Sequence, residues 1–411
     1  WILSKESFLE NYKWIDMLKL KFSVGQQGND NIGSYAYADL YTLTKVNDTT
    51  MSPSFYQIGN PDITWETTTN INAGVEFTLW NGRLSGNVDF YTKKTTDLLF
   101  WLSVPESAGS RGYYGNIGDI RNTGVEMALT GTLIRNRFIN WDLSLNFSHN
   151  KTKILSLPET KVADNGGFIS SNDARTYQNW YEVGGELYTP FMAEYAGLNE
   201  KGEALYWVDE EFVGADGKAT LNSKPGKNHS FTTTDFSQAT RYKHESVLPK
   251  LFGGFSTSIR VGDFDASASF DYQLGGKVYD IRYKSLMTPS SLGGNGGNNF
   301  HKDYVKSWSP ENTSSNIPRW QYGDLYTSAA SNRWLTSASY LNFQSFTVGY
   351  TLPKKFVKSV GKIRIYAAGE NLGFWSARKG LDPRYSFEGN ESSVNVYSPI
   401  RNISGGVQVT F

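Results

Sequence analysis

The sequence predicts an all-β fold, a transmembrane antiparallel β-barrel, on three observations. Apolar and polar residues alternate with period two through most of the chain, which puts one kind of side chain on each face of a sheet. Short turns alternate with long loops between the predicted strands. Several of the 25 Tyr and 12 Trp residues lie near predicted strand ends, where barrel strands leave a membrane.

Composition excludes several other classes of protein. The 40 Lys and Arg residues balance 40 Asp and Glu residues, which argues against a nucleic-acid-binding protein, since these carry a basic excess or a basic face. The chain has no Cys, so disulfides, thiolate zinc sites and cysteine nucleophiles are excluded. The longest strongly apolar stretch, about residues 98–104, is far shorter than the roughly 20 residues of a transmembrane helix.

The first clear hairpin covers residues 71–90. Apolar side chains occupy the odd positions of residues 71–79, and in the next run they are Leu84, Val88 and Phe90. Asn81-Gly82 lies between the two runs, and type I′ turns prefer this dipeptide because both of their central residues need positive φ. We therefore expect a tight hairpin.

Three further hairpins follow the same pattern. Residues 125–133 and 141–147 are joined through Arg135-Asn136-Arg137, residues 255–261 and 264–272 through Gly262-Asp263, and residues 346–350 and 363–367 through residues 353–361. Leu341 and Phe343 have the opposite parity to Phe346. Because a one-residue slip moves a side chain to the other face, a β-bulge is expected near Gln344 or Ser345.

With an early strand at residues 18–24 and a last one at residues 405–411, about ten strands are predicted. Their approximate limits are residues 17–26, 64–79, 84–104, 118–134, 141–155, 250–262, 263–275, 337–351, 361–374 and 401–411. The long connections are residues 26–63, 104–117, 155–250, 275–338 and 374–401. Loops this long count against a compact soluble domain.

Alternation alone fits a soluble sandwich as well as a barrel. Outer-membrane barrels have short turns at one rim and long loops at the other, so the loop asymmetry favours the barrel. Aromatic residues near strand ends favour it too: Trp14, Trp80, Tyr91, Trp141, Tyr272 and Tyr350. The polar residues predicted to line the lumen are Asn72, Glu76, Asn87, Asp89, Asp142, Ser267 and Asp271.

A series of short motifs resembles one family in order along nearly the whole chain. They are NPDITWETTTN (residues 60–70), GVEF (74–77), DFYTKKTTDLL (89–99), GQQGN with IG (25–29, 32–33), NIG with NTGVE (116–118, 122–126), FSHNK (147–151), LPK with GGF (248–250, 253–255), GYTLP (349–353), GENL (369–372), GLDP (380–383) and the terminal Phe411. Together they resemble the barrel of SusC/RagA-type TonB-dependent outer-membrane transporters of Bacteroidetes.

The resemblance implies a barrel of about 22 strands with an N-terminal plug and a TonB-contacting box. Residues 1–411 are then expected to be the C-terminal barrel portion, with the plug and the TonB box absent from this chain. The start at Trp1, with no Met and no signal peptide, agrees with a piece of a longer chain.

The resemblance also implies a function, location and partners. It implies import of glycans, oligosaccharides or peptides through the outer membrane of a Gram-negative cell. The implied partners are a SusD-like lipoprotein lid, TonB acting through the missing N-terminal part, outer-membrane lipid, and a second transporter–lipoprotein pair in a dimer. Many members carry an Asp-rich loop where this chain has GLNEKGE at residues 197–203, so no calcium site is expected there.

No catalytic, cofactor-binding or metal-binding residue is expected, and substrate-contact residues are not identified. His149, His229, His244 and His301 lack metal-site spacing. Asp209-Glu210-Glu211 with Asp216 is interpreted as a solvated acidic loop, and Gly293-Gly294-Asn295-Gly296-Gly297 as a flexible loop. The aromatic residues of the long loops fit either ligand contact or loop packing: Trp180, Tyr181, Tyr188, Phe191, Trp207, Trp308, Trp320, Tyr322 and Trp334.

Two alternative functions have less support in the sequence. A small outer-membrane barrel enzyme, a hydrolase, would need a nucleophile elbow or a spaced acid pair with His, and neither is present in the sequence. A soluble carbohydrate-binding β-sandwich would be favoured by an internal repeat of roughly 100 residues, and no such repeat is found. The chain is therefore predicted not to be an enzyme.

Overall fold

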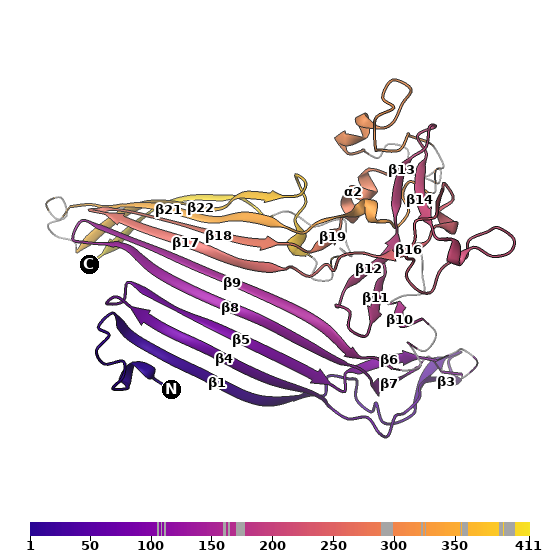
Figure 1. The fold of residues 1–411 in the computed structure, drawn as a ribbon, viewed down its shortest axis with the longest axis horizontal. Helices are drawn as coiled ribbons and strands as arrows, with labels where there is room; N and C mark the ends of the chain where they lie inside the picture. The colour runs from indigo at the N-terminus through magenta and orange to yellow at the C-terminus, as the bar shows by residue number, and fades with distance from the viewer. Residues whose placement is uncertain are drawn as a thin grey trace.

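The computed structural model describes residues 1–411 apart from 105–106, 108, 111, 159–161, 163–164, 170–176, 289–298, 322–323, 325, 354, 356–360, 386–388 and 390–398. Its main feature is one ten-stranded antiparallel sheet, which we call the wall (Figure 1). Each strand of the wall pairs with the next wall strand along the chain, in the order β1-β4-β5-β8-β9-β17-β18-β21-β22-β23. The predicted antiparallel all-β fold is confirmed.

The ten wall strands are those that the alternation predicts. They are β1 (Ile15–Asn29), β4 (Glu66–Leu79), β5 (Leu84–Thr96), β8 (Asp119–Arg135), β9 (Ile139–Ser156), β17 (Leu251–Val261), β18 (Phe264–Leu274), β21 (Tyr340–Thr351), β22 (Lys362–Ser376) and β23 (Asn402–Thr410). The strand predicted for residues 84–104 is too long, since β5 ends before Asp97, which has φ 58°. Residues after it form β6 (Leu99–Ser103), which pairs with β7 (Gly112–Asn116) outside the wall.

The short turns lie at one end of the wall and the long loops with their small sheets at the other (Figure 1). At the predicted type I′ turn, Asn81 and Gly82 have φ values of 57° and 71°, and the Arg83 amide donates to the Trp80 carbonyl at 3.3 Å. Gly262 has φ 60° in the two-residue turn between β17 and β18. Both predicted turns are confirmed.

The predicted bulge lies at Gln344. On β21, Ser345 pairs with Ser269 of β18, whereas Phe343 pairs with the next residue, Phe270. Gln344 is the extra residue between these two pairs. Because of the extra residue, Phe343 and Phe346 both lie on the apolar face, although their positions have opposite parity.

The outermost strands of the wall are β1 and β23. The outer edge of β1 pairs only with the first residues: Trp1 and Leu20 exchange both backbone hydrogen bonds, and Ile2 bridges Lys19. No other pairing on these two edges involves a described residue. The wall is thus an open curved sheet in this chain.

Apart from η1 (Leu3–Lys5), which precedes β1, the other elements of the described residues lie in the long loops. The additional strands are β2 (Leu40–Lys45), β3 (Met51–Gln57), β10 (Gly167–Ile169), β11 (Asn179–Glu182), β12 (Thr189–Ala193), β13 (Tyr195–Leu198), β14 (Ala204–Val208), β15 (Phe231–Thr233), β16 (Arg241–Lys243), β19 (Lys277–Tyr279) and β20 (Leu335–Ser337). The helical segments are η1 (Leu3–Lys5), η3 (Glu210–Phe212), η4 (Phe236–Gln238), α2 (Ile281–Leu286), η5 (Lys302–Lys306), η6 (Asn332–Trp334) and η8 (Pro383–Tyr385).

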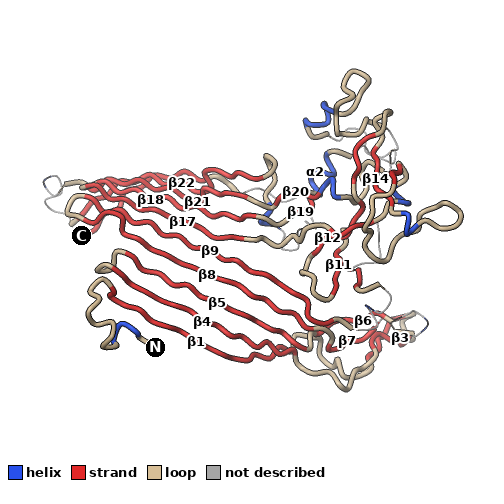
Figure 2. The backbone as a smooth tube through the Cα atoms, in the orientation of Figure 1, coloured by secondary structure: helices blue, strands red, loops and turns tan. Residues whose placement is uncertain are grey.

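The helices are short and lie outside the wall (Figure 2). Among the residues that the structure describes, no helix is both long and apolar enough to cross a membrane.

Most fully buried side chains belong to the loops rather than to the wall. We call the described residues within 165–247, 277–338 and 378–385 the loop domain. Its core clusters centre on Tyr206, on Trp334 with Met192 and Tyr279, and on Val278 with Leu381. The loop domain is therefore a packed unit at the long-loop end of the wall.

Candidate functional site

The polar face of the wall is a network of paired side chains. The residues predicted to line a lumen share this face because their positions have one parity in the observed register. Asn87 Nδ2 donates to Asp89 Oδ2 at 2.6 Å, and Asn342 Nδ2 donates to Asp271 Oδ1 at 2.7 Å. The face is hydrophilic, and its hydrogen bonds run along a strand, as in β5, and across strands, as between β21 and β18, which suits an aqueous barrel interior.

Ion pairs on this face reach over an intervening strand. Lys21 Nζ on β1 lies 3.1 Å from Asp89 Oδ1 on β5, and Gly74 of β4 lies between them in the register. A Cβ on Gly74 would come within 2.1 Å of the Asp89 carboxylate. Glycine is therefore required at this position if the ion pair is to form.

A shallow depression of about 500 Å³ lies beside this pair on β1, β4, β5 and β8. Its polar lining includes Lys21, Glu76, Asn87 and Thr130. Charges of both signs with hydroxyl and amide groups suit hydrogen bonding to a polar solute.

The opposite face of the wall is apolar and exposed. Phe22, Phe90 and Val407 are 73%, 56% and 62% exposed. Phe270 stacks between Phe255 and Phe343, with ring centroids 4.6 and 4.5 Å apart. In a soluble sandwich a second sheet would cover this face, and among the described residues none does.

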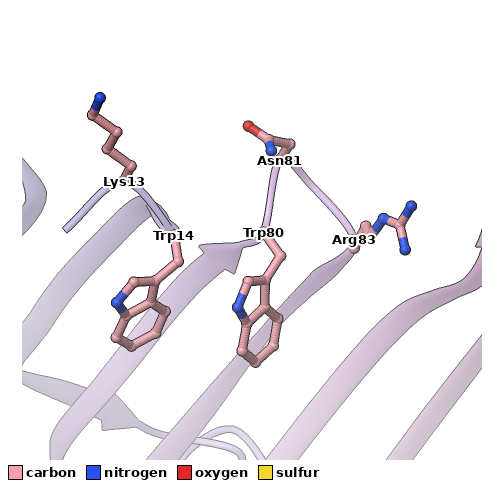
Figure 3. A pocket seen from close by; sticks show the side chains of 5 residues that line it. All are labelled: Lys13, Trp14, Trp80, Asn81 and Arg83. Atoms are coloured by element: carbon pink, nitrogen blue, oxygen red, sulfur yellow. The ribbon is translucent and has the colours of Figure 1, made fainter.

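Two stacked tryptophans mark the short-turn rim. The rings of Trp14 and Trp80 are 5.9 Å apart at 26°, and with Lys13, Asn81 and Arg83 they line an open pocket of about 630 Å³. In Figure 3 the two indoles extend side by side along the strands while Lys13 and Arg83 point away from them. Amphipathic rings with basic groups beyond them are typical of a membrane interface.

Of the other aromatic residues predicted to lie at strand ends, three do so and one does not. Trp141 lies near the start of β9, and Tyr272 and Tyr350 lie near the ends of β18 and β21. The prediction is wrong for Tyr91, which lies in mid-β5 on the polar face and donates from Oη to Asn150 Oδ1 at 3.2 Å.

The loop aromatic residues mostly pack rather than face solvent. Trp180, Phe191 and Trp334 are buried in the loop domain, and Trp308 covers Gly202. The Trp207 ring packs against the His229 ring at a tilt of 47°, with the ring centroids 5.0 Å apart, and Trp320 is exposed. Tyr181 and Tyr188 are partly buried, while Tyr322 and residues 293–297 lie outside the described part of the chain.

The structure separates the four histidines. His229 Nε2 lies 3.3 Å from Glu194 Oε2, and His244 Nε2 lies 3.2 Å from the Met192 carbonyl. His149 pairs with the Lys250 carbonyl and His301 with Asp303. No group of three His, Asp or Glu residues in the described ranges could hold a metal ion.

The acidic loop is partly mispredicted. Glu210 is exposed as expected, but Asp209 is buried and accepts backbone hydrogen bonds from Lys227 and Asn228, both at 2.8 Å. These hydrogen bonds lower the pKa of Asp209 against the opposing effect of burial. Asp209 is therefore a structural anchor rather than a solvated charge.

Comparison with known proteins decides the family. The family model described as "TonB dependent receptor-like, beta-barrel" matches residues 11–262, more than half of the chain. The chain belongs to this family.

Related TonB-dependent receptors share sequence along the whole chain. "TonB-dependent receptor P3" of Formosa agariphila is 28% identical over 438 residues, which cover 100% of this chain and 41% of that protein. "TonB-dependent receptor SusC" of Bacteroides thetaiotaomicron is 27% identical over 399 residues, covering 93% of this chain and 37% of that protein. The chain thus spans about two fifths of the length of these relatives.

The RagAB peptide transporter has a similar structure. It superimposes with a TM-score of 0.78 at 28% identity, covering 98% of this chain and 42% of the matched chain. The RagAB peptide importer in its "closed-closed" state gives a TM-score of 0.79 at 27% identity. The resemblance to SusC/RagA-type receptors, inferred from the motifs, is confirmed by these matches.

Some features of this TonB-dependent receptor chain were not predicted from the sequence. An ion pair that reaches over a glycine depends on the register of three strands. The one sign of it in the sequence is that Gly74 occupies a position of the polar face. Two arginines, Arg241 and Arg333, are largely buried in the loop domain, where burial lowers the pKa of each, that of Arg241 to about 10. Their loop segments show no periodicity from which burial could be predicted.

Proposed function

We propose that this chain forms part of the barrel of a TonB-dependent importer in the outer membrane of a Gram-negative cell. The observation that carries the proposal is the two-faced wall, with an exposed apolar face opposite a hydrogen-bonded polar face. Lipid against the first face and water against the second satisfy both. Family membership supports the same reading.

We infer that residues 1–411 are the C-terminal portion of a larger closed barrel, whose plug and TonB box lie elsewhere in the protein. Lipid cannot hydrogen-bond the backbone groups along the outer edges of β1 and β23, so further strands must cover them. The relatives, of which this chain spans about two fifths, are long enough to supply those strands.

The proposed cargo is a glycan, an oligosaccharide or a peptide, and the proposed partners are a SusD-like surface lipoprotein and TonB. Similarity to a protein named SusC and to a structure described as a peptide transporter supports this choice. A dimer of transporter–lipoprotein pairs is part of the same proposal.

The alternative of an outer-membrane hydrolase has less support. The matched proteins are named as receptors, transporters or importers, and none of these names describes an enzyme. No observation on the wall or the loop domain favours hydrolysis over binding.

Purification and uptake test the proposal together. The full-length protein, tagged and extracted from outer membranes with detergent, should shift in gel mobility on boiling and bring down a surface lipoprotein. Cells should take up labelled peptides or oligosaccharides only when both this protein and TonB are present. Uptake that is unchanged when the protein is deleted would contradict the proposed function.

A further inference from the structure

Arg333 is a largely buried cation that has no carboxylate partner among the described residues. Within the described part of the chain, its one hydrogen bond runs from Nη1 to the Thr327 carbonyl at 3.3 Å. The guanidinium carbon lies 4.5 Å from the Trp334 ring and 5.5 Å from the Tyr195 ring. Burial lowers the pKa of Arg333, because the charged form loses part of its hydration.

A buried charge without a counter-ion destabilises the folded protein. Buried charges in proteins are normally paired, because attraction to aromatic rings and one long hydrogen bond replace only part of the lost hydration. The guanidinium has five N–H donors in a planar fork, and the structure assigns an acceptor to one of its nitrogens. The remaining donors match the two oxygens of a carboxylate.

The Tyr304 hydroxyl is a second unsatisfied donor in the same cluster. The hydroxyl oxygen is buried and has no hydrogen-bond partner among the residues that the structure describes. Tyr304 packs on the Trp334 cluster and interacts electrostatically with Arg333. Burial raises the pKa of Tyr304 to about 12, so the hydroxyl keeps its proton and can donate it.

Several neighbouring groups of this cluster already have partners, although the Tyr279 hydroxyl and Ser331 Oγ are also buried without one in the described ranges. The hydroxyls of Tyr195, Tyr206 and Tyr283 donate to the Asn316 carbonyl, the Tyr326 carbonyl and Asp303 Oδ2. The carboxylates of Asp324 and Asp280 are engaged too: Asp324 accepts from the Tyr326 and Thr327 amides, and Asp280 accepts from Arg378. These carboxylates therefore do not neutralise Arg333, and a hydroxyl group could not supply the missing negative charge.

We propose that Arg333 and Tyr304 form a binding site for a carboxylate group of the solute that the receptor takes in. This inference rests on the proposed import function and narrows it to acidic solutes. The carboxylate would lie against the guanidinium fork and accept a further hydrogen bond from Tyr304. A peptide C-terminus and a uronic acid of a glycan carry the same group, so both sources fit.

The test uses the full-length protein and two matched pairs of probes. One pair is a hexapeptide pool with free C-termini and the same pool amidated; the other is tetragalacturonate and its methyl ester. Titration calorimetry should show one acidic probe binding at least about tenfold more tightly than its neutral counterpart. The pair that shows the difference identifies the source of the carboxylate.

Variants connect this preference to the site. Arg333→Gln should abolish the difference, Tyr304→Phe should reduce it severalfold, and Arg333→Lys should keep part of it and fold normally. Arg319→Gln is the matched control, since Arg319 is already paired with Glu203 at 2.8 Å and should leave the preference intact. Far-ultraviolet circular dichroism and heat-dependent gel mobility check that each variant is folded.

The outcomes separate the two proposals. Equal binding of acidic and neutral probes by the wild-type protein, or a preference that survives in Arg333→Gln, would overturn the carboxylate site and leave import standing. A wild-type protein that binds no peptide and no oligosaccharide would contradict the proposed function, and the carboxylate site with it.

Discussion

Lys21 and Asp89 form an ion pair across an intervening strand, with their charged atoms 3.1 Å apart over Gly74. The same arrangement recurs on the polar face of the wall. Arg364 Nε donates to Asp265 Oδ1 at 2.9 Å across β21, where Gly349 is opposite Asp265 and the Arg364 side chain, opposite Thr351, passes over Gly349. Glycine at polar-face positions thus lets long side chains connect strands that are not neighbours.

Gly349→Ala should break the Arg364–Asp265 pair without unfolding the wall. A Cβ at Gly349 would come within 2.4 Å of the end of the Arg364 side chain, which can move away only by leaving Asp265. Because the pair is bidentate and partly exposed, the expected loss is about 1 kcal/mol of unfolding free energy, measured by denaturant titration of the detergent-solubilised protein.

Gly131→Ala is the control for this measurement. Its added Cβ would meet no atom closer than 3.9 Å. A Gly349→Ala variant that keeps the ion pair in its structure and matches Gly131→Ala in stability would refute the role of glycine in these pairs.

A charge should be tolerated on one face of β21 and not on the other. Val348 lies on the exposed apolar face and Thr347 on the polar face. Val348→Arg should destabilise the membrane-inserted protein by about 2–4 kcal/mol if it lies near the middle of the bilayer, less near the interfaces. Thr347→Arg should cost much less, and equal costs in vesicle unfolding would be evidence against the assignment of the faces.

Asp280 should be critical for the loop domain. Its buried carboxylate accepts the Tyr283 amide at 2.9 Å at the start of α2 and pairs with Arg378, whose Nε lies 2.9 Å away. Asp280→Ala leaves Arg378 unpaired and removes the cap, so local stability should fall by about 3–5 kcal/mol. Hydrogen exchange of residues 278–287 measures this.

The exposed pair of Lys45 and Asp48 supplies the comparison. Asp48→Ala should change local protection by no more than about 0.5 kcal/mol. If Asp280→Ala had an effect equally small, the buried pair would not be what holds α2 in place.

The loop domain should lose stability in mild acid through His244. Burial lowers the pKa of His244, against opposing effects of its hydrogen bond to the Met192 carbonyl and of Glu194. Below the unfolded pKa of about 6.5, the unfolded segment takes up a proton that the folded one resists, so stability falls as pH falls. Hydrogen exchange of β12 and β16, corrected for intrinsic rates, should show less protection at acidic pH.

His244→Gln removes this titration. Protection of β12 and β16 in that variant should depend less on pH than in the wild type. An unchanged pH dependence would assign the effect to other groups.

The wall could be predicted from the sequence because the alternation of apolar and polar residues is visible within each strand. Period-two alternation locates all ten strands, and the parity change between Phe343 and Phe346 locates the bulge at Gln344. The predicted extent of β5 is too long. The chain turns at Asp97, which has a positive φ, and the apolar run after it belongs to β6.

The loop domain could not be predicted in the same way. Phe191 is buried against Trp180 and beneath the guanidinium of Arg241, 50 residues further along the chain. Such contacts depend on long-range packing of irregular segments, which leaves no periodic signal. For the same reason the unpaired Arg333 and Tyr304 emerge only from the structure.

Cysteine scanning of β21 tests the central claim most directly, because residues 1–411 contain no Cys. Single cysteines at residues 345–350, in the full-length protein freed of any other Cys, are challenged in intact outer membranes with a water-soluble and a lipid-soluble maleimide. The account predicts that Phe346, Val348 and Tyr350 positions react with the lipid-soluble reagent and Ser345, Thr347 and Gly349 positions with the water-soluble one. Uniform labelling by the water-soluble reagent along the strand would contradict a membrane-spanning wall.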